Sequence, residues 1–170
     1  EWVHTLSEEI QSEIAQRHFE DCLASIQKCE VFLQQNSTFA NAGETRDKLK
    51  GLKAILTDVL LNELSSTKKR DLQSVLRSSR RTLMLLVEMG KSRESSSIFL
   101  KVSSLALRTS QKNNRRNNLP VSELFFCDLA QIASEFMRAF QSHEACVSAL
   151  IVWSNDELSY FAQQIIKHFL

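Results

Sequence analysis

The residues of this chain best suited to chemistry are its cysteines and histidines, which could together hold a zinc ion. Cys22 and Cys29 lie seven positions apart near one face of an expected helix, but no histidine or second cysteine pair stands at zinc-binding spacing from them. We therefore predict no metal site. The cysteines are interpreted as small core residues in a reducing compartment, and they are Cys22, Cys29, Cys127 and Cys146.

Paired carboxylates are a second candidate, because general acid–base catalysis needs such groups within reach of one substrate. Glu8–Glu9 and Asp156–Glu157 are adjacent in the sequence, and neighbouring side chains on a helix diverge by about 100°. We interpret both pairs as charge near helix N-termini, where the helix dipole favours acidic groups. The histidines are interpreted as surface or capping residues, and they are His4, His18, His143 and His168.

Glycine-rich and nucleophile motifs do not occur in the sequence. Gly43, Gly51 and Gly90 are isolated, so no loop has the form that cradles a phosphate group. No G-x-S-x-G, H-E-x-x-H or C-x-x-C pattern occurs either. We predict no catalytic residue and no cofactor, and therefore a protein that is not an enzyme.

The composition favours a helical protein. Of 170 residues, 43% are hydrophobic and 24% are charged, while only three are glycine and one is proline, which leaves few residues suited to the tight turns between strands. No apolar run approaches the roughly 20 residues of a membrane span, and the N-terminus lacks a signal-peptide layout. The chain begins at Glu1 and ends within an amphipathic pattern, so we expect a longer parent protein.

Apolar residues recur at helical spacing in seven segments, which predicts seven helices. We expect a corner at Arg17–His18, a capping segment at Ser65–Thr67, a helix end at Gly90 and a loop over 111–118. Pro120 should stand just before or within the first turn of the next helix. The apolar stripes lie at about 3–14, 19–33, 49–64, 72–89, 98–105, 125–140 and 146–169.

Short connections favour antiparallel packing of neighbouring helices. We predict an all-α fold, an elongated rod of stacked antiparallel helical bundles. The first bundle is expected at 1–66 and the second at 67–170, with a junction over Ser65–Arg70. Aromatic residues gather in the second bundle and are interpreted mainly as core, with a pocket as the alternative: Phe125, Phe126, Phe136, Phe140, Trp153, Tyr160, Phe161 and Phe169.

Charge is unevenly distributed along the chain, although the formal net charge is only +1. Residues 1–44 carry two basic and eight acidic side chains, a net charge of −6. Residues 45–118 carry 17 basic and six acidic side chains, a net charge of +11, and residues 119–170 have a net charge of −4. A strongly basic middle segment is therefore flanked by acidic ends.

The basic middle segment has two interpretations. In one, it contacts an acidic partner, which would be a protein surface or anionic lipid; nucleic acid is not expected, because aromatic residues are not interleaved with the basic ones. In the other, it is a solvated helix face that pairs with the acidic flanks. The candidate basic surface comprises Lys68, Lys69, Arg70, Arg77, Arg80, Arg81, Arg108, Lys112, Arg115 and Arg116.

Three stretches resemble one protein family. Trp2 with Leu6–Ile10 and Ile14–Glu20 resembles the opening of the C-terminal helical region of the exocyst eighty-four-kilodalton subunit family. The run Leu85–Gly90, followed by Ile98–Leu100, resembles that family's leucine-rich helix, glycine stop and next helix. A later match is the aliphatic-tryptophan segment Leu150, Ile151, Val152 and Trp153.

The resemblance implies a non-enzymatic scaffold of a tethering complex, which holds secretory vesicles at the plasma membrane before fusion. Its implied partners are other helical-rod subunits of the exocyst and, through the parent protein, fusion machinery or regulatory small GTPases. Peripheral contact with anionic membrane and a cytoplasmic location at sites of secretion are further expectations. The alternative is a basic-surface adaptor that binds anionic membrane or nucleic acid.

Overall fold

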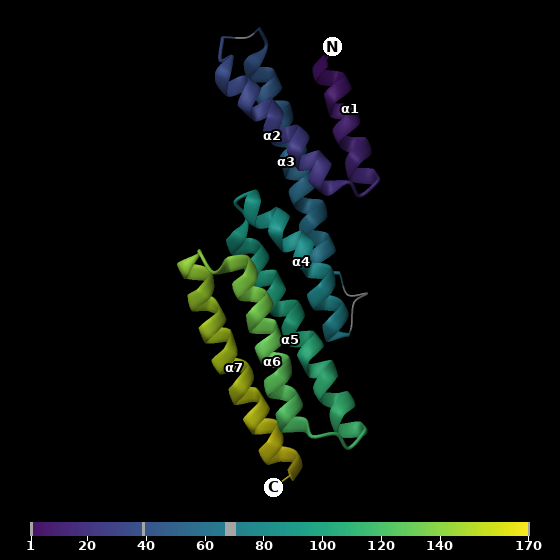
Figure 1. Cartoon of the computed structure of the whole chain (residues 1–170), viewed down its shortest axis with the longest axis vertical. Helices are drawn as coiled ribbons and strands as arrows, with labels where there is room; N and C mark the ends of the chain where they lie inside the picture. The colour runs from purple at the N-terminus through teal and green to yellow at the C-terminus, as the bar shows by residue number, and fades with distance from the viewer. Residues whose placement is uncertain (1, 39, 67–70, 170) are drawn as a thin grey trace. The chain divides into compact units, whose positions relative to one another are not determined.

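The computed structural model describes residues 2–38, 40–66 and 71–169. Seven α-helices account for most of these residues, and no strand occurs among them (Figure 1). The prediction of an all-α fold is confirmed. Within the described ranges, no helix combines the length and the apolar character needed to cross a membrane. The chain divides into two compact units, residues 1–60 and 61–170.

The first unit contains α1 (Trp2–Ala15), α2 (Phe19–Gln35) and most of α3 (Ala42–Leu64). α1 packs on α2, and α2 and α3 are joined by polar contacts. Arg46 Nη2 donates a hydrogen bond of 3.3 Å to the carbonyl oxygen of Leu33, and Lys53 Nζ lies 3.3 Å from Glu30 Oε2. Fully buried side chains of this unit include Ile10, Cys22, Leu23, Ile26, Leu33, Leu56 and Leu60.

The second unit contains α4 (Leu72–Glu88), α5 (Ser92–Arg116), α6 (Val121–Phe140) and α7 (Glu144–Phe169). α5 and α6 each pack against the other three helices of the unit (Figure 1). Consecutive helices run in opposite directions, so α5 and α7 run in the same direction side by side. α7 therefore packs on α5 as well as on α6.

Aromatic side chains form much of the second unit's core. Phe125 stacks on Phe161 with ring centroids 4.0 Å apart, and Phe136 lies 4.7 Å from Phe140. These four rings are buried, as the core interpretation predicted. Phe126 is different, because 51% of its surface is exposed, and Tyr160 and Phe169 are exposed as well.

Three helices end in the same way, with one residue in the left-handed region. These residues are Arg17, Gly90 and Asn118, with φ of 64°, 77° and 54°. After α4, the amide of Gly90 donates to the carbonyl of Val87 and the amide of Lys91 to that of Leu86. This pair of bonds is the Schellman motif. The predictions of a corner at Arg17–His18 and of a helix end at Gly90 are confirmed.

Two sequence predictions are wrong. The expected loop over 111–118 is helical to Arg116, because the Schellman turn at Asn118 ends the helix later than the polar composition indicated. The N-cap of α4 is Asp71 and not Ser65–Thr67: its Oδ2 accepts from the amide of Ser74 at 3.1 Å. Thr67 itself lies outside the described residues. The boundary at 66/67 and the rod arrangement stay predictions.

Two glycines allow a matched test of these helix geometries. Gly51 lies inside α3, and an added Cβ would meet nothing within 4 Å. Gly51→Ala should therefore raise the free energy of unfolding by about 0.5–1 kcal/mol. Gly90→Ala should lower it by about 1 kcal/mol, since φ is 77° there. Urea titrations followed by circular dichroism measure both, and an equal effect of the two substitutions would contradict the assignment of Gly90.

Candidate interaction surface

The structure separates the predicted basic surface into groups. Lys68, Lys69 and Arg70 lie outside the described residues. The other seven belong to two helices: Arg77, Arg80 and Arg81 to α4, and Arg108, Lys112, Arg115 and Arg116 to α5.

The α4 group is partly engaged in ion pairs within the second unit. The guanidinium of Arg80 binds the carboxylate of Glu135 on α6 through two nitrogens, and Arg138 lies 3.8 Å from the same carboxylate. The hydrogen bond from Arg80 to Glu135 raises the pKa of Arg80. Arg77 is exposed, and no carboxylate of the described chain lies within ion-pair distance of it. Arg80 therefore joins α4 to α6 and is not a free docking residue.

A buried carboxylate dominates the contact between α5 and α7. Glu157 on α7 is 6% exposed, and its Oε2 lies 3.3 Å from Arg108 Nη2 on α5. Ser104 Oγ donates to the same oxygen at 3.0 Å, and Trp153 Nε1 donates to Ser104 Oγ at 2.8 Å. The guanidinium of Arg108 also lies 4.2 Å from the ring centroid of Tyr160. Arg108 is thus the counter-charge of a buried group.

The interpretation of Asp156–Glu157 as charge at a helix N-terminus is wrong, because α7 begins at Glu144. The same holds for Glu8–Glu9, since no acidic residue lies in the first turn of α1. A signal for Glu157 was present in the sequence. Glu157 continues the apolar stripe of Leu150, Trp153 and Phe161, and a charged residue inside such a stripe requires a buried partner.

The last turns of α5 carry cations without a carboxylate partner. Within the part of the chain that the structure describes, Lys112, Arg115 and Arg116 form no ion pair. A small cavity of about 30 Å³ adjoins Lys112 and Arg115. Gln111 Nε2, on the wall of this cavity, is buried and has no hydrogen-bond partner among the described residues. The cavity holds about one water-sized group, so this end of α5 is suited to anionic groups at its surface rather than inside it.

One serine–histidine contact resembles a nucleophile and a base. Ser92 Oγ lies 3.1 Å from His143 Nε2. The other ring nitrogen, Nδ1, lies 3.4 Å from Ser142 Oγ and not from a carboxylate that would orient it. Ser92 is buried at the start of α5. The contact therefore fastens the α6–α7 turn to α5.

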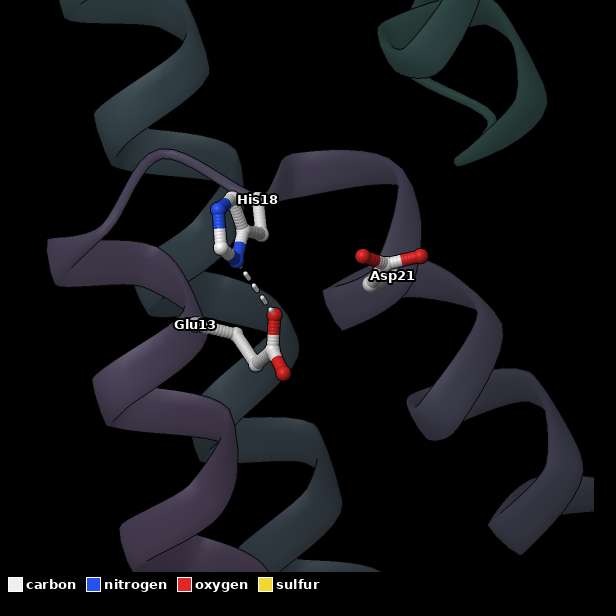
Figure 2. A group of neighbouring side chains, drawn as sticks. All are labelled: Glu13, His18 and Asp21. Carbon is white, nitrogen blue, oxygen red and sulfur yellow. Dashed lines mark ion pairs between the residues drawn. The ribbon is translucent and has the colours of Figure 1, made fainter.

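A second cluster of ionisable groups lies at the α1–α2 corner (Figure 2). Glu13, His18 and Asp21 offer ligand atoms that all lie within 4.8 Å of one another. His18 Nδ1 lies 3.3 Å from Glu13 Oε2, and the two form an ion pair when His18 is protonated. His18 and Asp21 are exposed, and groups of this kind are the side chains that a divalent metal binds. Glu13 Oε2 is buried and has no hydrogen-bond partner among the described residues, so its proximity to His18 is its one polar contact there. The cluster is interpreted as a link between α1 and α2.

The thiol of Cys22 lies beneath this corner and is fully buried. Burial raises the pKa of Cys22 to about 11, and the negative charge of Glu13 adds to the rise. Burial also raises the pKa of Cys29. The Cys22 thiol is therefore protonated at neutral pH, and Cys22 and Cys146 are buried, as the core interpretation predicts. Cys29 is half-buried, and the core interpretation is wrong for Cys127, whose side chain is exposed.

Comparisons with known proteins agree with the resemblance seen in the sequence. The family model described as exocyst component 84 C-terminal matches residues 1–170. Exocyst complex component 8 of Xenopus laevis is 30% identical over 173 residues, which cover 98% of this chain and 25% of the relative. The Gallus gallus protein is also 30% identical, and the Homo sapiens protein is 27% identical; each match covers 98% of this chain and 24% of the relative. No solved structure matches the chain significantly.

The Arg108–Glu157 pair should contribute to stability. Arg108→Ala should lower the free energy of unfolding by about 1–3 kcal/mol, less than for a fully buried pair because Arg108 is 33% exposed. Adding Glu157→Gln should recover part of this loss, because the uncompensated charge is removed. Arg138→Ala is the matched control and should cost under about 0.5 kcal/mol, because Arg138 is exposed and Glu135 keeps its bond to Arg80. Equal losses for Arg108→Ala and Arg138→Ala in urea titrations would contradict this account.

Thiol labelling should distinguish Cys22 from Cys127 by their rates of reaction. At pH 8, iodoacetamide should modify the exposed Cys127 rapidly and Cys22 slowly, because the Cys22 thiol stays protonated. Glu13→Gln should lower the pKa of Cys22 and shift its labelling profile to lower pH, whereas Glu8→Gln should leave the profile unchanged. Since the folded pKa of Cys22 is raised, its contribution to stability is present below the unfolded pKa and is lost as the pH rises towards about 11. Mass spectrometry of labelled peptides measures the profiles.

Proposed function

Because the chain belongs to the exocyst component 84 C-terminal family, we propose that it is a non-enzymatic scaffold that binds other helical-rod subunits of the exocyst. The match of the family model to residues 1–170 is the observation that carries this proposal. We further propose that, as part of this complex, the protein helps to hold secretory vesicles at the plasma membrane before fusion. The cytoplasmic location at sites of secretion belongs to the same proposal.

The chain spans about a quarter of the length of the curated relatives that it matches. The functions of the whole protein are therefore assigned to its parts only as proposals. Contacts with vesicle fusion machinery or with regulatory small GTPases are assigned to the parent protein. Binding of partner subunits is assigned to the helices described above.

The exposed side of α7 supports a role in binding proteins. Ile151, Leu158, Ile166 and Phe169 are each between 41% and 58% exposed, and they recur at helical spacing along α7. Between Ala145 and Ile166, only Asp156 and Glu157 carry a charge. Depletion of charged residues with exposed apolar side chains is typical of the centre of a protein–protein interface. We name Ile151, Leu158, Ile166 and Phe169 the α7 outer face.

Peripheral contact with anionic membrane is the second candidate function. Its specific support is the group Lys112, Arg115 and Arg116 at the end of α5, whose charges are not compensated by carboxylates of the described chain. Three clustered cations attract an anionic surface by about 1 kcal/mol each. Arg80 and Arg108 do not support this candidate, because each has a carboxylate partner.

A binding experiment with separate subunits tests the scaffold proposal. The purified chain should capture one or two helical-rod subunits of the exocyst selectively. Ile151→Asp combined with Leu158→Asp should reduce the captured amount at least tenfold, because charges would enter an apolar contact. Met84→Asp is the matched control, since Met84 on α4 is 62% exposed but lies outside the α7 outer face. Capture of no subunit would contradict the scaffold proposal.

The membrane candidate is tested by flotation with phosphatidylserine vesicles at low and high salt. Wild-type chain should float at low salt only, and a triple variant with Lys112, Arg115 and Arg116 changed to Glu should stay in solution. Flotation that does not depend on anionic lipid, or that the triple variant retains, would exclude this candidate.

A further inference from the structure

An apolar groove lies between α5 and α7, nearer the N-terminal ends of both helices than the cavity beside Arg108. Its volume is about 470 Å³, and most of its lining is apolar. Leu100 on α5 and Cys146 and Trp153 on α7 form the floor. The buried Ser96 belongs to the floor as well. The exposed lining residues beside the floor include three small ones, Ser97, Ala145 and Ala149.

The polar atoms of the groove floor are already bonded within the second unit. Ser96 Oγ donates to the carbonyl of Arg93 at 3.0 Å, and it also lies 3.4 Å from Cys146 Sγ. The indole N–H of Trp153 is used by Ser104. An occupant would therefore meet carbon surface on the floor and would need no polar group there.

Two cations stand along one side of the groove. Arg93 and Lys101 are both exposed residues of α5, and no described carboxylate lies within ion-pair distance of either. Glu94, the acidic residue next to Arg93, is instead 3.9 Å from Lys91. Eight positions separate Arg93 from Lys101, which is roughly 12 Å along a helix. The edge thus carries two uncompensated positive charges at the spacing of about two helical turns.

We propose that this groove, which we name the α5/α7 groove, binds an amphipathic helix with acidic residues along one edge. This inference rests on the scaffold function proposed above and specifies the chemistry of the partner. Small side chains on both walls allow the backbone of a third helix to approach closely, as in ridge-into-groove packing. Two acidic side chains seven or eight positions apart on that helix can pair with the two cations, one with Arg93 and the other with Lys101.

The charge pattern selects the occupant. A basic or neutral helix would leave Arg93 and Lys101 beside apolar surface without partners, which disfavours it relative to an acidic one. A single anionic group is also a poor match, because the floor offers it no free donor and the two cations lie too far apart to bind it together. Apolar contact supplies affinity, and the two cations fix the direction and register.

Two synthetic helical peptides of about 18 residues test the proposal. Both carry an alanine and leucine stripe, and they differ only at two edge positions about seven residues apart, which hold glutamate in one peptide and lysine in the other. Fluorescence anisotropy with the whole chain should show binding of the glutamate peptide at least tenfold tighter than that of the lysine peptide. A double variant with Arg93→Glu and Lys101→Glu should reverse this preference.

Two further variants separate groove binding from general attraction of acids to a basic protein. Ala149→Trp fills the α5/α7 groove from an exposed position and should abolish binding of the glutamate peptide with little change in the melting temperature. Lys112→Glu removes a cation outside the groove and should leave binding within twofold. Equal binding of both peptides, or unchanged binding to the Ala149→Trp variant, would overturn the proposal. If subunits of the exocyst are still captured in that case, the scaffold function stands without this groove.

Discussion

The packing of the second unit depends on neutralising one carboxylate. Glu157 lies in the apolar stripe by which α7 contacts α5, and a charge in such a place is strongly unfavourable unless it is paired and hydrogen-bonded. Arg108 supplies the charge, and Ser104 supplies a hydrogen bond that Trp153 in turn supports. These bonds fix the register of α7 on α5. Both the cavity beside Arg108 and the α5/α7 groove depend on that register.

Pairing of basic side chains with carboxylates also explains how charge is distributed in the second unit. The sequence shows a basic middle segment between acidic ends, and the second unit brings parts of these segments together. Arg80 binds Glu135 and Arg108 binds Glu157, so two of the candidate docking residues satisfy carboxylates of the acidic C-terminal segment. The interpretation as a face that pairs with acidic flanks holds for these two. The unpaired cations on α5, together with the exposed Arg77 on α4, are the ones available to partners.

Much of the fold could be predicted because apolar periodicity is a local property. Seven helices, the corner at Arg17 and the stop at Gly90 follow from spacing and from single residues. The end of α5 could not be predicted in this way. Its polar residues 111–116 are helical because Ser110 and Arg108 contact α6 and α7, and because Asn118 adopts a left-handed conformation. Such contacts join residues far apart in the sequence, and composition does not reveal them.

The interaction surfaces were harder to predict than the helices for the same reason. The ten basic residues formed one group in the sequence, yet the seven that the structure describes occupy two helices, and among them Arg80 and Arg108 are paired with carboxylates. Arg93 and Lys101 were not selected, because they are spread along a helix and do not form a run of charge. Their significance appears only when α7 lies beside α5 and the small residues of both helices form a common groove.

The parallel alignment of α5 and α7 also bears on the order of folding. Neighbouring helices of the second unit meet across short turns, so their contacts close small loops and form early. The bonds that join Ser104 and Arg108 to Glu157 connect residues 53 and 49 positions apart. They can form only after α6 has folded back along α5. From this separation we expect docking of α7 to be a late step, in which burial of the Glu157 carboxylate completes the second unit rather than starting it.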